Sequence, residues 1–100
     1  GMFMGEAIFG LMEPGAIELV SYGDCDMFAA KYKSDGSLSW AKSAGGEHWD
    51  YGFSITALSD DYTVVTGYFS MLTIFGKNEP NQTEFVSKGQ EDIFIAQYAP

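Results

Sequence analysis

Basic residues are scarce in this sequence. Lys and Arg together number five against 14 Asp and Glu, which gives a formal net charge of −9. An acidic surface repels phosphate backbones, so nucleic acid is not expected as a partner. The same charge disfavours adsorption to anionic membranes. The simplest consequence of this charge is solubility.

Long hydrophobic runs, cysteine pairs and catalytic motifs are also missing. No apolar run reaches the roughly 18 residues of a membrane-spanning helix, so no membrane insertion is expected. Cys25 is the only cysteine, which excludes an internal disulfide, and we interpret it as an inert thiol. No Ser or Cys nucleophile lies beside a supporting base, and no cofactor motif is present. We therefore expect a protein without catalytic activity or cofactor.

Metal-ligating residue types gather in only one place. Glu47, His48 and Asp50 lie within four residues and could in principle bind a divalent ion. However, the group lies in a Gly-rich loop and has no second histidine. We therefore interpret it as a solvated turn and predict no metal site.

Two acidic pairs could supply calcium oxygens, but neither follows a known calcium loop. These are Asp24 with Asp26, and Asp60–Asp61. Asp26 recurs later in the chain as Asp92, which indicates a structural task performed twice. We predict that each of these two carboxylates caps a turn by accepting backbone N–H groups.

Short runs of β-branched and aromatic residues dominate what remains. Helical periodicity is hard to find, and each run ends in Gly, Asp, Ser or Asn. Residues Met71–Glu91 read as a long connector with short strands at 73–76 and 84–87. The pattern predicts an antiparallel meander of four strands at residues 26–32, 37–43, 51–58 and 62–69.

The strongest signal is that residues 1–34, the first copy, recur as residues 67–100, the second copy. The alignment has no gap, and 15 of 34 positions are identical, where chance would give about two. Such self-similarity is typical of repeat architectures, in which units bury their apolar faces against neighbours. The sequence predicts an all-β fold of propeller-type blade repeats.

The repeat divides the chain into three parts. Residues 1–25 read as the end of one blade and a connector, 26–70 as one complete four-stranded blade, and 71–100 as a connector with the first strand of the next. About one and a half units are therefore present. If half of the apolar side chains stayed exposed to solvent, about 7–15 kcal/mol of burial free energy would be lost, which is comparable to the stability of a domain. We expect either assembly with copies of itself or attachment to further blades of a longer chain.

Five linked segments carry a family resemblance. They are Asp26-x-Phe-x-Ala-Lys-Tyr32, Asp35-Gly-x-Leu-x-Trp-Ala-Lys42, Gly45-Gly46, Asp50-Tyr-Gly-x-Ser-Ile55 and Val65-Thr-Gly-Tyr-Phe69. This series resembles the bacterial SBBP-type β-propeller repeat. The resemblance implies tandem blades in large secreted or cell-surface bacterial proteins, hence an extracellular location. It brings no catalytic residues with it.

Two functions follow as expectations. The first is a non-catalytic structural or protein-interaction module that associates with itself through incomplete blades. The alternative is a carbohydrate- or peptide-binding propeller segment that uses loop aromatics. For that alternative, Trp49, His48 and Tyr51 are the candidate ligand contacts.

Overall fold

The chain folds into β-strands and turns alone, which confirms the all-β prediction. The computed structural model describes all residues 1–100 and contains no helix. Accordingly, no helix is long and apolar enough to cross a membrane. The eight strands are β1 (Met2–Phe3), β2 (Glu6–Phe9), β3 (Ile17–Val20), β4 (Asp26–Tyr32), β5 (Leu38–Gly45), β6 (Asp50–Ala57), β7 (Thr63–Phe75) and β8 (Thr83–Tyr98).

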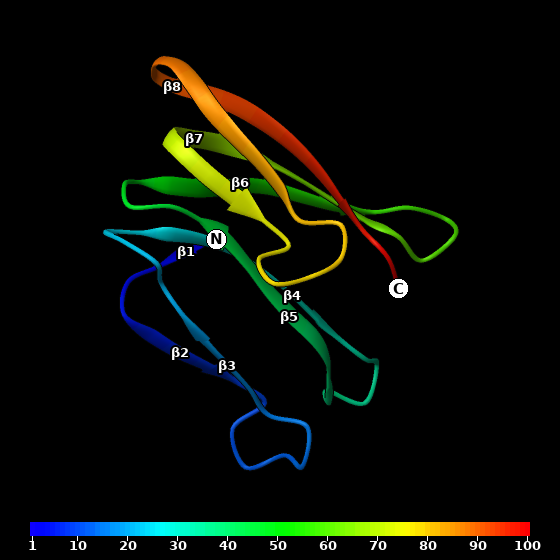
Figure 1. Cartoon of the computed structure of the whole chain (residues 1–100). Coiled ribbons are helices and arrows are strands. Elements are labelled where there is room, and N and C mark those ends of the chain that lie inside the picture. The colour runs from blue at the N-terminus through cyan, green and yellow to red at the C-terminus, as the bar shows by residue number, and fades with distance from the viewer.

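Six of these strands form one antiparallel sheet. Its order is β1-β4-β5-β7-β6, and β8 also pairs with β7. The remaining strands, β2 and β3, form a separate hairpin. In Figure 1 this hairpin lies at the bottom, β7 and β8 lie at the top, and β4 and β5 run between them. The two halves of the sheet thus face each other across a small core.

The predicted meander is wrong in one pairing. β4 pairs with β5 and β6 pairs with β7, as expected, but β5 does not pair with β6. Instead, Ala44 and Gly45 at the end of β5 pair with Phe75 and Ile74. This is possible because β7 continues beyond Phe69 to Phe75. The segment expected to be a connector with two short strands is therefore mostly the far half of a long β7–β8 hairpin, with a register shift between Ser70 and Leu72.

The two copies of the repeat share the register of their hairpins. In each copy a hairpin pairs in the same register, so that every matching residue pair differs by 66 in both numbers. The first copy splits its hairpin into two ladders, whereas the second joins them into β7 and β8. Matching pairs are Phe3–Asp26 with Phe69–Asp92, and Phe9–Ile17 with Phe75–Thr83.

The recurring aspartates cap turns, as predicted. The backbone N–H of Tyr22 donates to Asp26 Oδ2 at 2.8 Å, and that of Lys88 donates to Asp92 Oδ2 at 2.9 Å. Each bond ties the chain just before the strand to the strand's first residue, which fixes where β4 and the matching part of β8 begin.

The hydrophobic core is small and lies between β4–β5 and β7–β8. Only 15 of 100 residues are buried, while many large apolar side chains remain exposed, which agrees with the expectation of an under-covered unit. The buried cluster consists of Met27, Ala29, Ala44, Val65, Phe69 and Phe94.

Candidate functional site

The predicted ligand contacts lie at the start of β6. Trp49 and Tyr51 stack with ring centroids 5.8 Å apart and planes at 17°. Tyr51 stacks in the same way on Phe53, at 6.1 Å and 17°. Trp49 and Phe53 are 43% and 68% exposed, so these three rings form an open aromatic row. His48 is exposed and lies next to the row in sequence.

Two members of this aromatic surface, Tyr68 and Phe53, are not among the three ligand contacts predicted from sequence. Tyr68 on β7 packs against the row, with its ring 4.7 Å from Tyr51 and 5.1 Å from Phe53. The spacing of 49, 51 and 53 is a signal that would have found Phe53, because alternate residues of a strand share one face. Tyr68 joins only through the cross-strand pair with Tyr51, which local sequence does not reveal.

The solvated-turn interpretation of residues 47–50 is correct for Glu47 and His48 but wrong for Asp50. Glu47 and His48 are exposed, whereas Asp50 is completely buried. Its carboxylate accepts the backbone N–H of Gly46 at 2.9 Å and the hydroxyl of Thr73. Through these two hydrogen bonds, Asp50 connects the β5–β6 loop to β7. No group of three metal-ligating side chains is assembled.

Three ionisable groups, Cys25, Asp26 and Asp50, are buried close to one another. Burial raises the pKa of Asp26, and the hydrogen bond from the Tyr22 N–H offsets part of this rise. Burial also raises the pKa of Asp50, and the hydrogen bond from the Thr73 hydroxyl offsets part of that rise. Burial, followed by the charge of Asp26, raises the pKa of Cys25, as an inert thiol requires. The folded chain therefore binds these carboxyl protons more tightly than the unfolded chain. Their contribution to stability is complete below the unfolded pKa and is lost as pH rises through the raised values.

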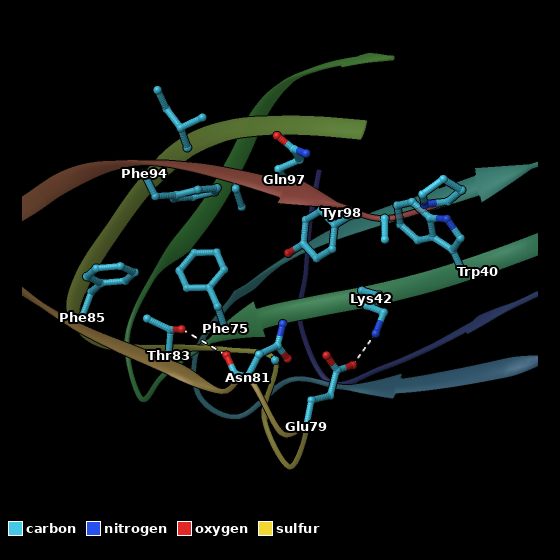
Figure 2. A pocket seen from close by; sticks show the side chains of 15 residues that line it. Trp40, Lys42, Phe75, Glu79, Asn81, Thr83, Phe85, Phe94, Gln97 and Tyr98 are labelled. Carbon is cyan, nitrogen blue, oxygen red and sulfur yellow. Dashed lines mark hydrogen bonds and ion pairs between the residues drawn. The ribbon is translucent and has the colours of Figure 1, made fainter. Parts of the chain in front are cut away.

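A groove of about 490 Å³ lies between β5 and the second copy. Figure 2 shows Trp40 and Tyr98 close together at one end, with ring centroids 5.7 Å apart and the Lys42–Glu79 ion pair beside them, while Phe85 and Phe94 lie toward the opposite end. Burial, and then the charge of Glu79, raise the pKa of Tyr98 to about 12. The phenol therefore stays neutral at physiological pH.

The groove has an apolar, aromatic wall. Phe75 and Phe94 form its aromatic wall, with centroids 5.1 Å apart, and Phe85 borders it further along. The groove is not predictable from sequence, because it is built from residues more than thirty positions apart, on strands whose stacking the repeat does not specify.

The most informative surface is the outer face of β8. Met27 and Ala29 on β4 are 0% and 3% exposed, and their repeat equivalents on β8 are Ile93 and Ile95. These two isoleucines are 81% and 77% exposed. A position that is core in the first copy is thus open to solvent, and more apolar, in the second.

Comparison of the chain with family models, with curated proteins and with solved structures gives no match. Functional inference therefore depends on the repeat, the exposed faces and the groove.

Proposed function

We propose that this chain is a non-catalytic repeat module whose units stack face to face, either with copies of itself or with neighbouring units. The observation that carries the proposal is the contrast between buried Met27 and Ala29 and exposed Ile93 and Ile95 at equivalent positions. Two exposed isoleucines on one strand face are expensive to leave in water, at about 1.5–3 kcal/mol each. The resemblance to SBBP-type propeller repeats supports placing such a module in a secreted or cell-surface bacterial protein.

The internal stacking suggests how one unit would meet the next. Met27 in the first copy contacts Tyr98 in the second, with the phenol oxygen 4.0 Å from the sulfur. Tyr98 is the repeat equivalent of Tyr32, which is 48% exposed. By the same geometry, Ile93 of one unit would meet the Tyr32 face of another. The two faces differ, so the contact is head to tail and can continue from unit to unit.

Association is expected to depend on the β8 face. The wild-type chain is expected to form oligomers whose mass rises with concentration, measured by size-exclusion chromatography with light scattering. Replacing Ile93 and Ile95 together by Asp removes about 3–6 kcal/mol of apolar burial, so we expect association to weaken by about a hundred-fold or more.

The matched control for this measurement is Met12→Asp. Met12 is 94% exposed in the turn between β2 and β3, and it lies on neither β4 nor β8. This substitution also adds a negative charge and removes a large apolar side chain, but it leaves β8 unchanged. A wild-type chain that stays monomeric at high concentration, or equal losses in Met12→Asp and in the isoleucine variant, would contradict the proposal.

The aromatic row supports a second candidate, a carbohydrate- or peptide-binding surface. The near-parallel rings of Trp49, Tyr51 and Phe53, of which the outer two are exposed, offer flat apolar faces on which a sugar ring can stack. We expect binding on a glycan array to fall at least ten-fold in Trp49→Ala, with Tyr22→Ala, an exposed tyrosine outside the row, as control. Absence of binding across a broad panel would dismiss this candidate.

A further inference from the structure

The two equivalent strands β4 and β8 differ in how many of their edges are paired. β4 pairs with β1 along one edge and with β5 along the other. β8 pairs with β7 along the edge that corresponds to β1, and no strand occupies its other edge. The unpaired edge of residues 92–98 therefore corresponds to the edge on which β4 holds β5.

The direction of the backbone groups on this edge follows from the first copy. Phe28 exchanges hydrogen bonds with Gly1, at 2.9 and 3.0 Å, so its N–H and C=O face the β1 side. Successive residues of a strand alternate in direction, so Ala29 faces β5. By the repeat, Ile95 directs its N–H and C=O to the free edge of β8.

The first copy also uses a glutamate to fix the start of β5. Glu13 Oε2 accepts the backbone N–H of Leu38 at 2.9 Å, and Leu38 packs over Gly10. Because Gly10 has no Cβ, the leucine can approach the turn closely.

The second copy repeats this glutamate and glycine as Glu79 and Gly76, which border the groove. Glu79 uses Oε1 to bind Lys42, and no donor occupies Oε2. Where the first copy is filled by Leu38, the second copy is hollow. The second copy thus has the same three features that hold β5 in the first copy, but no strand is bound to them. These features are the free edge of β8, the acceptor Glu79 Oε2 and the apolar groove.

We propose that the free edge of β8 and the adjoining groove bind an extended strand with the sequence pattern of β5, supplied by another repeat unit of this kind. The register of the first copy predicts that Ile95 opposes the Lys42 position of the added strand and Tyr98 opposes its Leu38 position. The leucine enters the groove between Tyr98 and Gly76, and its N–H binds Glu79 Oε2. This inference rests on the proposed function, because it treats the chain as a repeat module.

The probe is a synthetic peptide of residues 35–46 with a fluorescent label, titrated with the full chain and followed by anisotropy. Because Ala29 and Lys42 oppose each other and Ala29 faces β5, the Lys42 N–H points toward the paired edge and the Ala41 N–H points away. We expect saturable binding of the parent peptide. A single N-methyl group at Lys42 is expected to weaken it at least ten-fold, and one at Ala41 by no more than about three-fold.

Two further changes test the leucine and the edge. A peptide with Leu38→Asp is expected to bind at least ten-fold more weakly, because the groove wall is aromatic. In the protein, Ile95→Pro removes an edge N–H that β7 does not use, and Ile95→Thr keeps that N–H while removing the same apolar side chain. The proline variant is expected to bind the peptide at least ten-fold more weakly than the threonine variant, with both melting curves recorded beside the wild type.

The peptide pair keeps the inference testable even if the proline variant does not fold. No binding of the parent peptide, or equal weakening by the two N-methyl groups, would overturn the inference. The oligomeric state is measured separately. A chain that oligomerises without binding the peptide would support the proposed function and refute the strand site. A chain that binds the peptide but stays monomeric would support the strand site and contradict the proposed function.

Discussion

Gly67→Ala is expected to destabilise the folded state severely, because a methyl group at this position has no space. Gly67 lies on β7 opposite Gly52 on β6. A Cβ there would lie 1.7 Å from the carbonyl oxygen of Tyr51 and 2.9 Å from the ring of Phe94. Since the nearest atom belongs to backbone, β6 would have to move away from β7. We expect a loss of at least about 3 kcal/mol, the upper end of overpacking costs, in urea unfolding followed by tryptophan fluorescence.

The control substitution is Gly15→Ala. Gly15 lies in the β2–β3 turn, has no positive φ and would place its Cβ with nothing within 4 Å. The same chemical change is expected there to shift stability by less than about 1 kcal/mol, toward stabilisation. A Gly67→Ala chain that unfolds at the wild-type urea concentration would show that the two strands do not approach as closely as described.

The importance of Gly52 and Gly67 was accessible from sequence. Glycine within a strand pattern predicts a bulge or a close approach of backbones, and the two residues oppose each other next to a register shift. The repeat was equally informative, because identical positions at a fixed offset require the same local geometry. The matching turns and the caps by Asp26 and Asp92 follow from that identity.

The pairing of β5 was not accessible, since period-two alternation identifies a strand but not its neighbour. A meander was the simplest connection, yet the continuation of β7 to Phe75 gave Ala44 and Gly45 another partner. For the candidate site the limit is similar. Trp49 and Tyr51 were identified from their residue types, whereas the groove arises only when Trp40 and Tyr98 are brought together by stacking of the two copies.

The misassigned Asp50 shows a further limit. An aspartate in a Gly-rich segment, two residues after His48, is typical of a solvated loop, so composition alone predicts that it is exposed. Its partner, Thr73, lies 23 residues away on the far half of β7, which had been interpreted as a connector. Once β7 extends through this region, a carboxylate at position 50 has a buried hydroxyl and an amide to accept from, and its burial follows.

Removing this carboxylate is expected to have the second-largest effect on stability. Asp50→Ala leaves the Gly46 N–H and the Thr73 hydroxyl buried without an acceptor, which we expect to cost about 2–4 kcal/mol in urea unfolding.

The repeat itself supplies the test of mechanism, because the first copy has Ala7 where the second has Thr73. Thr73→Ala removes the stranded hydroxyl, so the double variant is expected to lose less than the sum of the single losses, with a coupling of about 1–3 kcal/mol. Asp24→Ala, at an exposed neighbouring carboxylate, is expected to change stability by less than about 0.5 kcal/mol. Additive losses at positions 50 and 73 would mean that Asp50 acts by filling space and not by accepting these bonds.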